Sequence, residues 1–127
     1  MKISLLFAAI LAVASIVCSA SKSLVISEDS NGMTLSVARD TTFTIALKGN
    51  ASTGFSWNIR DLDTTKLCIS GQSRFIGRDT IPGTSGTFYL DFKPVKKGVS
   101  TVRLIYSREW ETDIPPEDSF SITIRVK

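Results

Sequence analysis

Histidine is absent from all 127 residues of this chain. Serine and cysteine nucleophiles usually need a histidine as general base, and zinc sites usually include one as a ligand. The glycine-rich segments also lack the strand-to-helix setting and the lysine of a phosphate-binding loop. The sequence therefore excludes the common hydrolytic triads. We expect no enzymatic activity, no cofactor and no metal.

Cysteine is scarce, with only Cys18 and Cys68 present. Cys18 lies in an N-terminal segment that we expect to be removed, which leaves Cys68 without a partner in its own chain. In a secreted protein such a residue indicates a reactive thiol or an intermolecular bridge. Because Cys68 alternates with Leu67 and Ile69 in a strand-like run, we expect instead a small residue of the core.

Long hydrophobic runs are limited to residues 3–17, which lie between Lys2 and the small residues Cys18-Ser19-Ala20. This order is typical of a secretory signal peptide, and the run is short for a membrane span. We therefore expect residues 1–20 to be a signal peptide and 21–127 to form a single domain. The protein would enter the secretory pathway and be secreted or held in lysosome-like vesicles. A membrane anchor, a buried helix and a lipoprotein cleaved before Cys18 are the alternatives.

Runs of one charge are missing as well. The chain has 15 basic and 12 acidic side chains, a formal charge of +3, and the two signs are interspersed. Surfaces that bind nucleic acids or membranes concentrate lysine and arginine. We therefore expect neither a nucleic-acid partner nor a membrane partner, and we expect a monomer.

A sustained helical period is also absent, although residues 61–66 suggest one short helical turn with Asp61 or Asp63 as its cap. Polar and apolar residues instead alternate in short stretches near 24–28, 41–48, 55–60, 67–77, 86–93, 99–107 and 118–127. The pattern predicts an all-β fold, an immunoglobulin-like two-sheet β-sandwich of seven to eight strands. Trp57 alternates within one such stretch, so we expect it to be buried between the sheets.

Three short segments between the expected strands carry residues typical of loops. They read Asn50-Ala51-Ser52-Thr53-Gly54-Phe55, Gly83-Thr84-Ser85-Gly86 and Arg108-Glu109-Trp110. Connections between antiparallel strands emerge alternately at the two ends of a sandwich, and these segments follow the second, fourth and sixth expected strands. We therefore expect all three at one end, as in a binding surface.

The order and spacing of these segments resemble the chagasin family of cysteine-peptidase inhibitors. The loop motifs of that family read Asn-Pro-Thr-Thr-Gly-aromatic, Gly-x-Gly-Gly and Arg-Pro-Trp/Phe. The resemblance implies a reversible, tight-binding inhibitor of papain-like cysteine peptidases that occludes the active-site cleft with loops 50–55, 83–86 and 108–110. The peptidase-binding residues that it implies are Asn50, Ser52, Thr53, Gly54, Phe55, Gly83, Ser85, Gly86, Arg108 and Trp110.

The resemblance also implies a role for each loop. The first would enter the catalytic cleft, with Thr53 and Gly54 over the catalytic residues and Asn50 closing an Asx-type turn. The second would follow the non-primed side of the cleft, and the aromatic residue of the third would pack on the primed side.

The chain departs from the motifs where Ala51 and Glu109 replace prolines, Ser52 replaces a threonine and Ser85 replaces a glycine. Without the first proline, Asn50-Ala51-Ser52 is an acceptor sequence for N-glycosylation. We expect a glycan on Asn50 to block entry of the loop into a cleft.

Other functions stay open at this point. One is a secreted immunoglobulin-like adhesion or carbohydrate-binding module that uses an exposed Trp110 as a sugar platform. Another is a small hydrolase built on the neighbouring carboxylates Glu109, Glu111 and Asp113, although acid–base catalysis needs two carboxylates in a cleft with separated pKa values. The segments also have simple structural interpretations, as an ordinary hairpin turn and as Arg108 stacked on Trp110.

Overall fold

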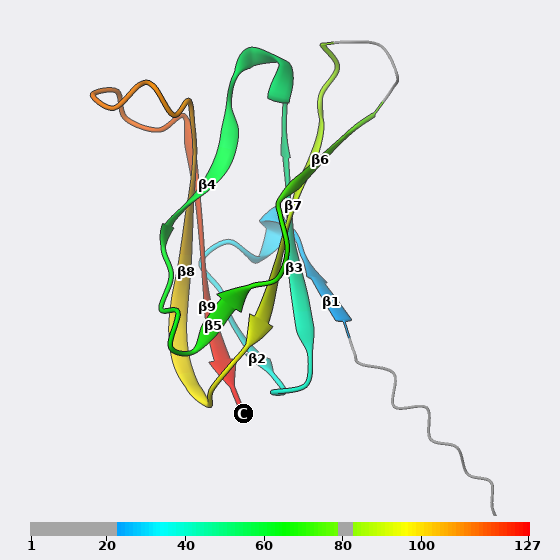
Figure 1. Cartoon of the computed structure of the whole chain (residues 1–127), viewed down its shortest axis with the longest axis vertical. Helices are drawn as coiled ribbons and strands as arrows, with labels where there is room; N and C mark the ends of the chain where they lie inside the picture. The colour runs from blue at the N-terminus through cyan, green and yellow to red at the C-terminus, as the bar shows by residue number, and fades with distance from the viewer. Residues whose placement is uncertain (1–22, 79–82) are drawn as a thin grey trace, which may run out of the picture.

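The computed structural model describes residues 23–78 and 83–127, and strands make up most of that part (Figure 1). No helix within these two ranges has the length and hydrophobicity of a membrane span. The elements in chain order are β1 (Ser23–Ile26), the 3-10 turn η3 (Glu28–Ser30), β2 (Thr34–Val37), β3 (Thr42–Gly49), the 3-10 turn η4 (Ala51–Thr53), β4 (Ser56–Asp61), β5 (Leu67–Ile69), β6 (Arg74–Gly77), β7 (Gly86–Pro94), β8 (Gly98–Ser107) and β9 (Asp118–Val126).

The strands form two sheets, which confirms the predicted all-β sandwich. One sheet has the order β1-β3-β7-β5, with β6 also paired to β7, and the other has the order β2-β9-β8-β4. β1 runs parallel to β3 and β2 parallel to β9, while the remaining pairs are antiparallel. From β3 to β9 the strands alternate in direction along the chain, with β5 and β6 running the same way (Figure 1). This alternation sets the end at which each loop emerges.

The predicted count of seven to eight strands is too low, because the described residues form nine. The four-residue strand β2 was not expected. The stretch 67–77 is divided into β5 and β6 around Gly71, which has a φ of +89°. Since β5 and β6 both run antiparallel to β7, the division leaves the position of the following loop unchanged.

The core lies between the sheets and follows the alternation of the strands. Its fully enclosed side chains include Phe43, Ile45, Leu47, Leu67, Phe92, Val102, Leu104, Ile122 and Ile124. Each side chain of this size contributes about 1.5–3 kcal/mol by burial. Trp57 is also buried, as predicted, with 5% of its surface exposed. Its indole N–H donates to the carbonyl of Lys48 at 3.1 Å, so the buried nitrogen has a partner.

Cys68 does not belong to this core, so its predicted role is wrong. The residue is half-buried and its thiol is free, whereas its neighbour Leu67 is fully enclosed. Successive side chains of a strand point to opposite faces, and Leu67 takes the inward position. The sequence run Leu67-Cys68-Ile69 contains only apolar residues, so it carried no sign of which face was inner.

The turn expected in residues 61–66 is present between β4 and β5, but as a turn and not as a helix. A carboxylate oxygen of Asp63 accepts hydrogen bonds from the hydroxyl of Thr65 at 2.5 Å and from its backbone N–H at 3.0 Å. These bonds, led by that of the hydroxyl, lower the pKa of Asp63 below its usual value. Asp63 is thus the cap of this turn, which lies at the end of β4 away from the loop 50–55.

Candidate functional site

The three segments singled out in the sequence lie at the same end of the sandwich, as expected (Figure 1). They follow β3, β6 and β8, which run in the same direction. Two hydrogen bonds join them. The side-chain amide of Asn50 donates to the carbonyl of Gly83 at 3.1 Å, and Nε of Arg108 donates to the carbonyl of Thr53 at 2.9 Å. The first segment is therefore tied to both of the others.

The first loop is closed by its own polar groups. The side-chain oxygen of Asn50 accepts from the N–H of Ser52 at 3.0 Å and from its hydroxyl at 2.6 Å, which is the predicted Asx-type turn. The hydroxyl of Thr53 donates to the carbonyl of Asn50 at 2.9 Å. Gly54 ends the turn with a φ of +85°, a conformation that favours glycine. The loop is thus ordered without the proline of the family motif.

Tyr106 holds the base of the first loop, and sequence analysis did not identify it. Its hydroxyl oxygen accepts a hydrogen bond from the backbone N–H of Asn50 at 2.8 Å. Its ring lies 5.0 Å from that of Phe55 and 5.2 Å from that of Trp57, measured between centroids. Trp57 is paired directly with Tyr106 across β4 and β8, so an alignment of these two strands would have revealed the contact.

Gly49 makes room for this aromatic cluster. A Cβ atom built on Gly49 would lie 2.7 Å from the ring of Phe88 and 2.9 Å from that of Tyr106. A larger residue would push one of these rings away from the base of the first loop. The close packing at the end of β3 therefore supports the position of Asn50, the next residue in the chain.

The third loop packs onto the first. The guanidinium of Arg108 lies over the ring of Phe55, 4.3 Å from its centroid, and donates to a carboxylate oxygen of Glu111 at 3.3 Å. Phe55, and not Trp110, is thus its stacking partner. Trp110 is 69% exposed, and its indole ring lies close to Gly54. A Cβ atom added to Gly54 would lie 2.5 Å from this ring.

The second loop divides into exposed and buried positions. Gly83, with a φ of +90°, and Ser85 are exposed, and the carbonyl of Ser85 accepts from the N–H of Arg78 at 2.9 Å. Gly86 is buried at the start of β7, where it pairs with Gly49 and Gly77. An added Cβ would collide with the backbone of β6. The prediction that Gly86 contacts a partner is therefore corrected, since its role is to let the strands approach.

Two of the acidic residues near the third loop, Glu109 and Glu111, line one hollow of about 390 Å³. Glu111 is bound to Arg108. Residues 23–78 and 83–127 contain no group of three or more histidine, cysteine, aspartate or glutamate side chains that could hold a metal ion.

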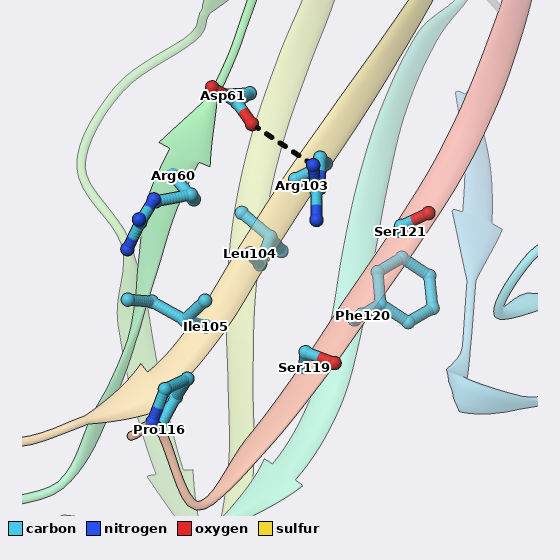
Figure 2. A pocket seen from close by; sticks show the side chains of 9 residues that line it. All are labelled: Arg60, Asp61, Arg103, Leu104, Ile105, Pro116, Ser119, Phe120 and Ser121. Carbon is cyan, nitrogen blue, oxygen red and sulfur yellow. Dashed lines mark ion pairs between the residues drawn. The ribbon is translucent and has the colours of Figure 1, made fainter. Parts of the chain in front are cut away.

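A hollow of about 550 Å³ lies beside β4, β8 and β9 (Figure 2), and its lining includes no residue of the three loops. Its lining consists of Arg60, Asp61, Arg103, Leu104, Ile105, Pro116, Ser119, Phe120 and Ser121. Asp61 is the one carboxylate in this lining, and it forms an ion pair with Arg103 at 3.6 Å. The hollow therefore lacks the two carboxylates that acid–base hydrolysis requires.

Comparison with known proteins identifies relatives. A family model described as chagasin family peptidase inhibitor I42 matches residues 36–124. Amoebiasin-2 of Entamoeba histolytica is 30% identical over 112 residues, which cover 81% of this chain and 85% of that protein. The crystal structure of the cysteine protease inhibitor EhICP2 from the same organism is similar with a TM-score of 0.73 at 26% identity, over 84% of this chain and 97% of that one.

A more distant structure shares the fold. PbICP-C in complex with falcipain-2 is similar with a TM-score of 0.52 at 14% identity, over 88% of this chain and 95% of that one. At this identity the likeness concerns the fold alone.

Proposed function

The chain belongs to the chagasin family of peptidase inhibitors and is not an enzyme, and we propose that it inhibits papain-like cysteine peptidases reversibly by occluding their active-site cleft. The surface that does so consists of loops 50–55 and 108–110 together with residues 83–85 of the second loop. The observation that carries the proposal is that hydrogen bonds join all three loops at one end of the sandwich. Loops that are ordered before binding lose little conformational entropy on association, which favours tight inhibition.

Two exposed residues supply the main contacts in this proposal. Thr53 lies exposed at the tip of the first loop, where it would enter the cleft together with Gly54. Trp110 is the anchor of the third loop, because a large exposed aromatic side chain at an interface often dominates its binding energy. A three-loop contact of standard size would bury about 800 Å² on each partner. Membership of an inhibitor family favours this role for Trp110 over that of a sugar platform.

A titration of active-site-counted papain tests the proposal. Residues 21–127, made without glycan, are expected to reduce papain activity stoichiometrically and reversibly. The variant Thr53→Arg places a long charged side chain at the tip of the first loop and should abolish inhibition. Thr64→Arg is the matched control, because Thr64 is also exposed but belongs to the turn between β4 and β5.

The two variants separate a specific loss from a general one. The proposal requires that Thr53→Arg does not inhibit papain and that Thr64→Arg inhibits it like the unmodified chain. A cooperative thermal unfolding transition should show that both variants are folded. It is contradicted if the unmodified chain leaves papain and a cathepsin-like enzyme fully active at micromolar excess. Equal inhibition by all three proteins would assign binding to another part of the molecule.

We also propose that the active form has an unmodified Asn50. The side-chain nitrogen of Asn50, the atom that a glycan would modify, donates to Gly83 between the first and second loops. A glycan on this atom would stand at the binding surface and block the cleft. If the chain secreted by a eukaryotic host carries a glycan, it should inhibit papain much less than the same chain made without glycan. Full potency of the glycosylated form would contradict this.

The location and the assembly state follow as proposals from the sequence. The signal peptide expected in residues 1–20 lies outside the described residues, and it supports passage through the secretory pathway. We propose that the protein acts there or outside the cell, as a monomer of residues 21–127. The N-terminal sequence of the secreted chain and its mass in solution by light scattering test both statements. A chain that keeps residues 1–20, or a dimeric mass, would refute them.

A further inference from the structure

Three peptide carbonyls of the first loop have hydrogen-bond donors inside the protein. The carbonyl of Asn50 accepts from the hydroxyl of Thr53 at 2.9 Å, and that of Ala51 accepts from the N–H of Gly54 at 3.1 Å. The carbonyl of Thr53 accepts from Nε of Arg108 at 2.9 Å. The first two donors lie within the loop itself. The third comes from a residue 55 positions away and thus links the loop carbonyl to a separate segment.

Arg108 is fixed in place on several sides. Its guanidinium lies on the ring of Phe55, which in turn stacks on Tyr106 at 5.0 Å between centroids. One of its terminal nitrogens pairs with Glu111 at 3.3 Å. Because the guanidinium is planar and its N–H groups point in fixed directions, these contacts orient Nε toward the carbonyl of Thr53. The oxygen of that carbonyl is consequently held against Arg108.

We infer that Arg108 is a positioning residue that keeps the first loop from being cleaved by the peptidase that it inhibits. The inference rests on the proposed function. It assigns to Arg108 a role beyond binding, because the side chain acts on the carbonyl of the peptide bond between Thr53 and Gly54.

The chemistry of cleavage explains why the orientation of this carbonyl matters. The catalytic thiolate would attack the carbonyl carbon of Thr53 and form a C–S bond, while the C–N bond to Gly54 breaks. The nitrogen of Gly54 would leave as an amine after taking a proton from the peptidase histidine. Water would then hydrolyse the thioester and release a carboxylate on Thr53 together with the thiol.

During attack, the carbonyl oxygen must turn toward the peptidase groups that stabilise its developing negative charge. An oxygen bonded to Arg108 faces the inhibitor instead. Release of the oxygen costs a hydrogen bond to a charged donor, which slows cleavage by about tenfold or more. The peptidase therefore holds a loop that fills its cleft but presents no carbonyl in the geometry for reaction.

The inference is tested by incubating the inhibitor with papain for a long time and then measuring cleavage of the inhibitor by mass spectrometry. The proteins are residues 21–127 with Arg108 unchanged, Arg108→Ala and Arg108→Lys, each at saturating papain. We expect Arg108→Ala to inhibit at first and then to be cut between Thr53 and Gly54 at least about ten times faster than the unmodified chain. Arg108→Lys keeps the charge but not the planar fork, so its cleavage rate should lie between the two.

Arg74→Ala is the matched control. Arg74 also lies over an aromatic ring, that of Tyr89, and also pairs with a carboxylate, that of Asp91, but it makes no contact with the three loops in the described structure. Its removal should leave the Thr53–Gly54 bond as resistant as in the unmodified chain. Equal cleavage in both alanine variants would indicate a general loss of stability and overturn the inference.

The remaining outcomes are also decisive. If Arg108→Ala binds more weakly but stays intact at saturating papain, Arg108 is only a contact or packing residue. If Arg108→Ala does not fold, Glu111→Gln tests the same point, because it removes the charge that holds the guanidinium and should raise cleavage in the same direction. If the cleavage rate of Glu111→Gln does not rise, the inference is overturned. Absence of inhibition by the unmodified chain would instead defeat the proposed function.

Discussion

Replacing Gly54 by alanine tests the packing of the third loop on the first. Gly54 has a φ of +85°, and a Cβ added there would lie 2.5 Å from Cη2 and 3.1 Å from Cζ2 of Trp110. A residue with a Cβ pays about 1–2 kcal/mol in this backbone conformation. The indole ring must also move, and because it is 69% exposed it can do so without disrupting the core.

Gly71 supplies a control with the same backbone strain. Its φ is +89°, and nothing lies within 4 Å of an added Cβ. Gly54→Ala and Gly71→Ala should therefore lose similar stability, about 1–2 kcal/mol, seen as a fall of roughly 4–16 °C in the unfolding midpoint. Only Gly54→Ala displaces Trp110. Loss of an aromatic anchor costs 2 kcal/mol or more, so its inhibition constant should rise about 30-fold.

The assay is inhibition of active-site-counted papain by both variants and by Gly54→Ala in a Trp110→Ala background. If Gly54→Ala acts by displacing Trp110, it should weaken inhibition much less in the Trp110→Ala background than in the otherwise unmodified chain. The reasoning is refuted if Gly54→Ala inhibits like the unmodified chain, or if its cost is the same with and without the tryptophan. It is also refuted if Gly71→Ala weakens inhibition to the same extent.

Three further variants have expected outcomes. Tyr106→Phe removes the hydroxyl that accepts from Asn50, so inhibition should weaken by about tenfold with the fold retained, as measured by titration and circular dichroism. Gly86→Ala forces a Cβ into the backbone of β6 and should prevent stable folding, which thermal unfolding would show. A hydrogen bond from the hydroxyl of Thr44 and the nearby Arg74 lower the pKa of Asp91, although partial burial raises it. The Asp91 carboxylate therefore stabilises the fold at pH values above its unfolded-state pKa of about 3.9. This stabilisation is lost as the pH falls below that value. Asp91→Asn should therefore lose less stability than the unmodified chain between pH 7 and pH 3 in thermal unfolding, and an equal loss would contradict this.

The parts of the structure that depend on local pattern were predictable from the sequence. Alternation located most strands and the burial of Trp57, because side-chain direction follows chain position along a strand. The turn at Asn50 and the positive φ of Gly54 follow from residue type alone. The common end of the three loops follows from the alternating direction of the strands.

Contacts between distant parts of the chain were not predictable in the same way. Tyr106 reads as one more aromatic residue of a strand, and only the register of β4 against β8 brings it to Trp57 and Asn50. Stacking of Arg108 on Trp110 was one alternative that the sequence left open, but the fold places the guanidinium of Arg108 over the ring of Phe55. Gly86 carried the sign of a loop residue, yet the approach of β6 buries it.

Hydrogen exchange of the inhibitor, free and bound to papain, is the measurement that tests the central claim most directly. In the complex, backbone amides in loops 50–55 and 108–110 and at residues 83–85 should gain protection. Amides in the turn between β4 and β5 and in the turn between β7 and β8, at the other end of the sandwich, should exchange as in the free protein. Protection confined to that other end, or to the outer faces of the sheets, would contradict the assignment of the three loops as the inhibitory surface.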